Sequence, residues 1–378
     1  MNIKFNPHRL IEAREARGMK QNMLSSIIGF STTSISKWEN GHIEPDPQTL
    51  DVLSKVLGLP TEWFFKPTLT TNSVYHFRSN SAATKTAQEI ARIRLRWVSE
   101  IVGNLNEWVD LPELNLIPSP TREEALILTN SEIESYALNL RKKLNLGISP
   151  ILNLTQLLES SGVIIVREES GFTSMDGVSA WIDDKPFIWV ASDKASYVRS
   201  RFDIAHELGH IILHKNLLPE DCNSLKHKHI EDQANKFAGF FLMPSEAMST
   251  TFRHVTLDTL LAQKKRWGIS VAAMISQCLN SQLIDEEQAL RLRKNLSFRK
   301  WRTREPFDDT MEPEKPILLE TSIKLLLEHG GFKKNNVIEK LGLSRGDIEQ
   351  LASLPVNFLS DTTDPEIVQL RRKNIKLV

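Results

Sequence analysis

The chain contains few cysteines and no long apolar run, and these absences exclude several classes of protein. Its two cysteines, Cys222 and Cys278, are too few for a framework of disulfide bonds and fit a reducing compartment. Charged residues follow closely on the N-terminal methionine, so no signal peptide is predicted. No apolar stretch approaches the ~20 residues that span a bilayer. We therefore expect a cytoplasmic protein of bacterial type, with no membrane partner.

The chain also lacks a net charge. Its 47 lysines and arginines balance its 47 aspartates and glutamates. The first 66 residues are nearly neutral as well, with eight basic and seven acidic side chains. Charge therefore gives no support for a nucleic-acid partner, and any such partner has to be argued from local residues.

The length of 378 residues predicts two or three domains. Apolar residues recur with helical spacing through residues 1–66, and glycines fall where those helices should end. Residues 67–83 are rich in Thr, Ser and Asn, which is typical of a linker. An amphipathic helix is predicted from about 84 to 109 and should pack between two domains, with dimerisation as the alternative. Residues 67–120 are thus interpreted as a linker and a connecting helix.

Residues 121–265 change from helical to strand periodicity and back, which predicts one α+β domain with a small sheet. Three apolar runs predict strands, at 163–166, 177–182 and 187–190, with a hairpin turn at 183–186. Long helices are predicted at about 197–214 and 230–242. Residues 266–378 are helical in pattern, and we expect them to serve packing and oligomerisation, with a second helix-turn-helix-like unit as the alternative. The predicted fold is multidomain and mainly α, with one α+β domain.

The segment His206-Glu207-Leu208-Gly209-His210 carries the clearest chemical signal. Helix residues turn by about 100° each, so His206 and His210 face one side and can bind a single metal ion. Glu207 lies beside them, where it can take a proton from a metal-bound water and later protonate a leaving amine. Such motifs also recur by chance, but the long amphipathic helix around this one argues against chance. The oxyanion donor stays open, with candidates chosen by proximity in sequence alone: Tyr197, Arg199, Arg201 and His214.

A catalytic zinc site usually has three protein ligands and a water, so a third ligand is needed. Glu231 is favoured because it lies 21 positions after His210, and the small residues Ala234 and Ala238 on its face would let the two helices approach closely. On the same face, Asn235 could hydrogen-bond a ligand histidine. Other candidates stay open: Asp232, His214, His227, His229 and Cys222.

The stretch from Arg201 to His214 resembles the signature helix of the ImmA/IrrE family of metallo-endopeptidases. The stretch from Glu231 to Pro244 resembles the second motif of that family. The resemblance covers about residues 120–265 and implies a zincin-like fold. It also implies zinc as the cofactor, with manganese as the alternative, and these roles: ligands His206, His210 and Glu231, and catalytic base Glu207.

Residues 20–41 have the pattern of a helix-turn-helix. Gly29 can end one helix, Ser31 can cap the next, and Ile35 and Trp38 point inward. Gln21 is placed to contact a phosphate and Asn40 another, while polar residues of the second helix suit a major groove: Thr32, Thr33, Ser36 and Lys37. The pattern resembles the Cro/repressor-like (lambda-repressor-like) helix-turn-helix of the XRE family. This implies a double-stranded DNA operator bound by a homodimer, with a protein-binding helical module as the alternative.

Two interpretations of the whole chain stay open. In the first, a DNA-binding transcription regulator uses a zinc endopeptidase to cut a regulatory protein or itself. Proteins that resemble it typically cut a repressor, and this derepresses genes under stress or in mobile elements. In the second, the peptidase fold is only a sensor or scaffold in a transcription regulator or an antitoxin. A complete ligand set with Glu207 in place favours the first.

Overall fold

The computed structural model describes residues 4–68, 74–79, 85–169, 175–192, 196–222 and 224–360. Parts of the predicted linker and the last 18 residues, 361–378, lie outside this description. The described residues form a mainly helical molecule around one four-stranded sheet, as the sequence predicts. Of the helices described, none has the length and apolar character needed to cross a membrane.

The N-terminal region is a bundle of short helices. Gly29 ends the second helix in the left-handed conformation at φ 75°, and the Ser31 side chain accepts the Ser34 N–H to begin the third. The apolar faces of these helices meet around the buried side chains of Leu24, Ile35 and Leu53. The elements are α1 Pro7–Ala16, α2 Gln21–Ile28, α3 Thr32–Glu39, α4 Pro47–Leu57 and the 3-10 helix η1 Thr61–Phe65.

The sheet has the order β1-β3-β4-β2, with β2 and β4 parallel and the other pairs antiparallel. The strands are β1 Tyr75–Ser79, β2 Ile164–Glu168, β3 Met175–Ile182 and β4 Lys185–Ala191. The prediction of a linker over 67–83 is wrong for its middle part, because β1 lies there and pairs with β3. The turn between β3 and β4 is also shorter than predicted. Asp183 and Asp184 form it at positive φ, and residues 185 and 186 already belong to β4.

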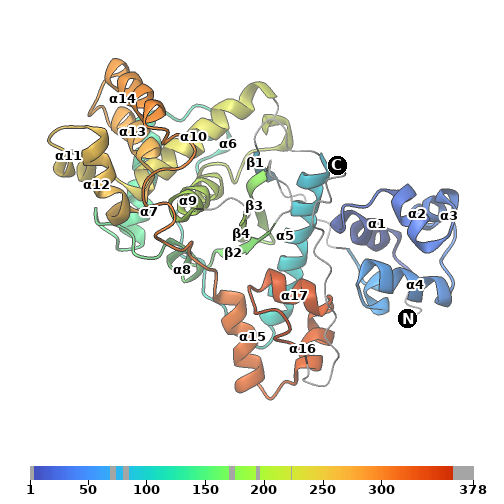
Figure 1. Cartoon of the computed structure of the whole chain (residues 1–378). Coiled ribbons are helices and arrows are strands. Elements are labelled where there is room, and N and C mark those ends of the chain that lie inside the picture. The colour runs from blue at the N-terminus through green and yellow to red at the C-terminus, as the bar shows by residue number, and fades with distance from the viewer. Residues whose placement is uncertain are drawn as a thin grey trace.

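The two faces of the sheet border two different hydrophobic cores. Ile165, Ile188 and Val190 face a core built by the central helices. Ile164, Val178 and Trp189 face a second core, which contains the buried side of α5 together with the N-terminal helices. Figure 1 shows α5 standing between the sheet and the N-terminal helices. The first core is built by α7 Asn130–Lys143, α8 Leu154–Glu159, α9 Tyr197–Leu213, α10 Ser224–Leu242, α11 Ser245–Thr251, α12 Leu257–Trp267, α13 Val271–Asn280 and α14 Glu286–Phe298; the short α6 Arg122–Ala125 and η2 Pro219–Cys222 flank it.

The C-terminal region is divided between these two cores. Helices α13 and α14 pack with the central helices, whereas α15 and α16 pack against α5, and α17 packs against β2 and α16. The predicted boundary between 265 and 266 therefore falls inside α12. Helix α5, Lys85–Leu105, buries Ala91, Trp97 and Ile101 in the second core, so it packs between domains as the sequence predicts. The last three helices are α15 Leu318–Glu328, α16 Lys334–Leu341 and α17 Arg345–Leu351.

A buried ion network fastens the N-terminal bundle to the rest of the molecule. Arg17, the C-cap residue of α1, donates to Asp347 of α17 at 2.6 Å and 2.9 Å. Arg94 of α5 donates to Asp347 at 2.6 Å and to Glu168 of β2 at 2.7 Å. Burial raises the pKa of the Asp347 carboxyl, but Arg17 and Arg94 outweigh burial and lower that pKa to about 2. The N-terminal helices, α5, α17 and the sheet are therefore joined by one network of ion pairs.

Candidate metal centre and DNA-binding helix

The candidate metal centre lies between α9 and α10. Helix α9 is capped by Ser196, whose side chain accepts the Arg199 N–H, and the helix packs against β3 and β4 of the sheet. Gly209 of α9 faces the backbone of Ala234 on α10, and a Cβ added at Gly209 would lie 3.1 Å from it. The two helices therefore approach closely where both residues are small, and this brings Glu231 opposite the histidines of α9.

Three side chains converge at this point. Nε2 of His206 and Nε2 of His210 lie 3.0 Å apart. One carboxylate oxygen of Glu231 lies 3.3 Å from Nε2 of His206, and the other lies 3.2 Å from Nε2 of His210. Tetrahedral zinc with bonds of about 2.0–2.1 Å holds its donor atoms about 3.3 Å apart. The spacing therefore suits one shared ion.

The protonation of the two histidines also suits a cation. Nδ1 of His206 faces the side-chain oxygen of Asn235 at 3.0 Å, so it carries the ring proton. Its Nε2 is then a bare acceptor directed at another acceptor, Glu231. Acceptor atoms at this spacing repel one another unless a positive charge lies between them.

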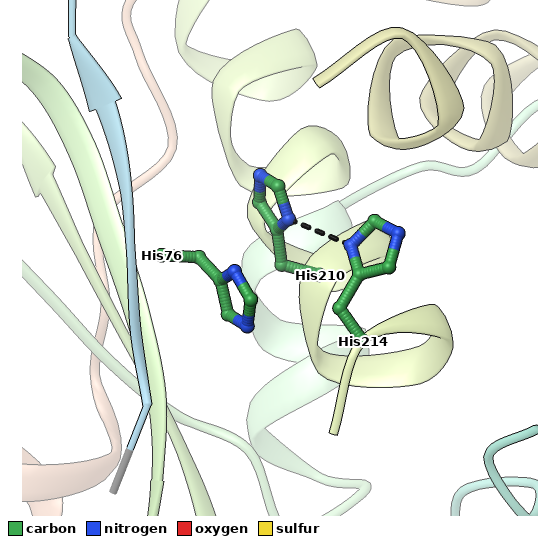
Figure 2. Close-up of side chains that lie close together, drawn as sticks. All are labelled: His76, His210 and His214. Carbon is green, nitrogen blue, oxygen red and sulfur yellow. Dashed lines mark hydrogen bonds between the residues drawn. The ribbon is translucent and has the colours of Figure 1, made fainter. Parts of the chain in front are cut away.

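A hydrogen-bond relay sets the tautomer of His210. The Gln233 amide donates to the carbonyl of Ala125 at 2.9 Å, so its oxygen accepts from Nε2 of His214 at 2.9 Å. Nδ1 of His214 therefore carries no proton and accepts from Nδ1 of His210 at 2.8 Å, as the dashed line in Figure 2 marks. This leaves Nε2 of His210 bare toward Glu231. Burial, with His210 and His76 nearby, lowers the pKa of His214, and this favours the neutral ring that the relay requires.

Glu207 is held on the sheet side of the centre. The Ser179 hydroxyl of β3 donates to the Glu207 carboxylate at 2.6 Å. Gly177, on the same face of β3, leaves the room that the carboxylate occupies, since a Cβ there would lie 2.7 Å from Glu207. The side chains of Ser179 and Glu207 are both buried, so the Glu207 carboxylate has a fixed place beside the histidines.

His76 of β1 is a site residue that sequence reasoning missed. Its ring stacks on His210 with centroids 4.7 Å apart and planes 5° apart, and Figure 2 shows it on the sheet side of the α9 histidines. Burial lowers the pKa of His76 to about 3, aided by the nearby His210. The only local signal was the alternation around it, with Tyr75 and Phe77 on the opposite face. The composition of the linker concealed that signal.

The predicted DNA-contacting residues gather on and beside α3. Thr32, Thr33, Lys37 and Asn40 are exposed, and Ser36 is half-buried. Gln21 is half-buried, and its amide donates to Glu39 at 2.7 Å. Glu39 also binds Arg14, so Gln21 ties the start of α2 to the end of α3. The polar side of α3 is therefore open to a partner while its apolar side is packed.

Comparison with known proteins identifies both regions. Residues 10–64 match the helix-turn-helix family model, and residues 158–277 match the model of the IrrE N-terminal-like domain, Peptidase_M78. The chain joins an XRE-type DNA-binding helix-turn-helix domain to an IrrE-like peptidase-family domain. The match of the IrrE-like domain includes β2, β3, β4, α9 and α10, but not β1.

Two curated proteins are similar over shorter stretches. "Repressor protein C2" of Salmonella phage P22 is 33% identical over 79 residues, which is 21% of this chain and 37% of the relative. The "SPbeta prophage-derived uncharacterized HTH-type transcriptional regulator YonR" of Bacillus subtilis (strain 168) is 35% identical over 60 residues, 16% of this chain and 56% of the relative. The chain thus spans between about a third and somewhat more than half of the length of these relatives, which support a helix-turn-helix regulator.

Four other candidate ligands in the IrrE-like domain do not belong to the group of His206, His210 and Glu231 that converges at the centre. Asp232 pairs with Lys236 at 2.6 Å on the outer side of α10. His227 lies 3.9 Å from Glu231 and is 43% exposed, and His229 bonds to Gln233. Cys222 is half-buried at the end of η2.

The four candidate oxyanion donors of the IrrE-like domain are engaged elsewhere. Arg201 binds Glu314 and the carbonyl of Ile151, and it also donates to the Tyr197 hydroxyl. Arg199 donates to Asp176 at 2.9 Å. His214 belongs to the relay behind His210.

Proposed function

We propose that this chain is a transcription regulator whose IrrE-like domain hydrolyses peptide bonds in a regulatory protein, either a repressor-type substrate or the chain itself. The observation that carries this proposal is the convergence of His206, His210 and Glu231 beside Glu207. Two imidazoles and a carboxylate form a ligand set of catalytic zinc, and a helix pair keeps it together. Manganese is the weaker alternative because imidazole ligands favour zinc.

The residues present fit such an ion. Both Nε2 atoms of the histidine pair are bare acceptors, and Glu231 adds a carboxylate, so the three would hold zinc. Bound there, zinc would polarise a water and lower its pKa toward neutrality. Asn235 and His214 orient the two rings through their Nδ1 atoms.

Glu207 is proposed as the general base. It lies next to His206 in sequence, and Ser179 fixes one of its oxygens by a donated hydrogen bond. Its carboxylate takes the proton of the attacking water and then passes that proton to the leaving amine. Because Ser179 donates to the carboxylate, the Ser179 hydroxyl also keeps Glu207 aimed during both transfers.

The helix-turn-helix domain would bring this activity to DNA. The exposed side of α3, with Thr32, Thr33 and Lys37, is proposed to enter the major groove of a duplex operator. Asn40 and Gln21 would contact phosphates, and the side-chain amide of Gln21 also donates a hydrogen bond to Glu39. Regulators that read two half-sites bind as dimers, so a homodimer is the proposed state on the operator.

The test compares wild type with Glu207→Gln, Glu231→Gln and a matched control, Asp232→Asn, which changes an exposed carboxylate on the same helix. Zinc content, cleavage of candidate repressors and of the chain itself, and gene regulation are measured. We expect Glu207→Gln to keep zinc and lose cleavage by about 10²–10⁴-fold, as loss of a general base does. Glu231→Gln should lose zinc, and Asp232→Asn should resemble wild type. If Glu207→Gln regulates its genes as well as wild type, the domain is a sensor or scaffold, as in a non-catalytic regulator or an antitoxin.

A further inference from the structure

The fourth strand of the sheet comes from outside the IrrE-like domain. Residues 158–277 supply β2, β3 and β4, whereas β1 lies between the helix-turn-helix domain and α5. Strand β4 pairs with one edge of β3, and β1 pairs with the other edge. Without β1, the matched part of the chain would expose that second edge of β3 as a row of unpaired backbone groups.

The register places β1 beside the residues that hold the candidate base. His76 lies opposite Ser179, and Arg78 lies opposite Gly177. Ser179 donates to Glu207, and Gly177 approaches the same carboxylate. Strand β1 is therefore paired directly with the two β3 residues that contact Glu207.

The side chains of β1 cover the centre and fasten the strand. His76 is buried on the face toward α9, where its ring stacks on the candidate ligand His210. Tyr75 and Phe77 point to the opposite face, where the guanidinium of Arg92 on α5 lies 5.2 Å and 5.6 Å from their rings. One face of this five-residue strand therefore touches the metal centre and the other touches the connecting helix.

An extended peptide binds an exposed sheet edge by adding a strand, with main-chain hydrogen bonds for affinity and alternate side chains for specificity. The edge of β3 beside Gly177 and Ser179 is such a surface, and a peptide on it would run past Glu207. We propose that this edge is the binding surface for an extended peptide substrate, and that β1 is an internal occupant that leaves before a substrate enters. The inference rests on the proposed function, because it assigns the substrate surface of the same site.

A cross-strand disulfide tests whether β1 must leave. Phe77 and Val178 are direct partners in the register and lie on the face away from the histidines. Antiparallel partners have Cα atoms about 4.5–5.5 Å apart, within the range that a disulfide spans. The double variant Phe77→Cys, Val178→Cys is made in the full chain with Cys222→Ser, and each single cysteine variant serves as its control. The probe is a fluorescent peptide hydroxamate added to zinc-loaded protein.

We expect the oxidised double variant to bind the hydroxamate at least tenfold more weakly than the same protein after reduction, with no redox effect in the single variants. In wild type, hydrogen exchange at residues 75–79 should accelerate when the hydroxamate binds, while β2 and β4 stay protected. Equal binding by the oxidised and reduced forms, or unchanged protection of β1 in the complex, would overturn the inference alone. Zinc-loaded, reduced protein that binds no hydroxamate would overturn the proposed function as well, and this outcome is distinct from the others.

Discussion

In the 2.8 Å hydrogen bond between His210 and His214, Nδ1 of His210 is the donor and Nδ1 of His214 is the acceptor. This direction follows from Gln233, whose oxygen takes the Nε2 proton of His214. We predict that His214→Phe, which fills the space but removes the acceptor, weakens zinc binding by about 10–100-fold, as loss of a partner behind a metal ligand does. Competition with a chelator on the full chain measures this affinity.

The matched control for this relay is His229→Phe. His229 also touches Gln233, at 3.1 Å, but it is exposed and does not contact either candidate ligand histidine. We expect its zinc affinity to change less than twofold. Equal losses in the two variants would mean that His214 acts only by supporting Gln233, and the tautomer argument would be wrong.

Local geometry explains why the centre could be predicted and why its surroundings could not. His206, Glu207 and His210 lie within five residues of one predicted helix, and Glu231 lies near the predicted start of a second helix. Each of these two predictions depends only on residues that are close in sequence. His76 is 134 positions before His210, and its place depends on a strand pairing that composition does not reveal. The linker-like composition around His76 predicts a loop. The alternating pattern of the five residues of β1 is too short to predict a strand against that composition.

The division of the C-terminal region shows the same limit. Helical periodicity correctly predicts that residues beyond 266 form helices in the part that the structure describes, up to residue 360. Which core each helix joins depends on contacts across the molecule, such as Arg17 with Asp347, which are 330 positions apart. No pattern within a single helix carries that information.

The ion network around Asp347 leads to a stability prediction. Asp347 is 5% exposed and receives donors from Arg17 and Arg94. Asp347→Asn leaves these guanidinium groups without their buried carboxylate, and we expect the free energy of unfolding to fall by about 3–5 kcal/mol. Urea unfolding of the full chain measures it. Asp51→Asn is the control, because Asp51 pairs with Lys55 in solvent, and such a pair contributes less than about 1 kcal/mol. Similar losses at both positions would show that the buried network does not fasten the two regions.

The helix-turn-helix domain allows a prediction about salt. Lys37 lies on the exposed side of α3, where a duplex would meet it. On DNA selected from a random duplex library, Lys37→Ala should weaken binding across all sequences and reduce the slope of log affinity against log salt by about 1. Lys55→Ala on α4 is the control, since its side chain is 74% exposed and it already pairs with Asp51. A slope that falls only in the control would place the DNA on α4 instead of α3.

Glu159 makes stability depend on pH near neutrality. Its carboxylate accepts the backbone N–H groups of Ile317 and Leu318 at the start of α15. Burial raises the pKa of Glu159 from 4.5 to about 7 in the folded chain, so the folded state holds a proton that the unfolded state releases. Stability from this group is therefore full below about pH 4.5 and is lost as the pH rises through about 7. The loss is at most about 3 kcal/mol, the free-energy equivalent of that pKa difference.

Glu159→Gln separates this effect from all other titrations. Glutamine keeps an oxygen that accepts from Ile317 and Leu318, but it cannot ionise. Urea unfolding of wild type and variant at pH 5, 6, 7 and 8 gives the difference in unfolding free energy at each pH. We expect that difference to shift in favour of the variant as the pH rises, because only the wild type must bury a charge at pH 8. A difference that stays constant from pH 5 to 8 would mean that Glu159 has the same pKa in the folded and unfolded chain.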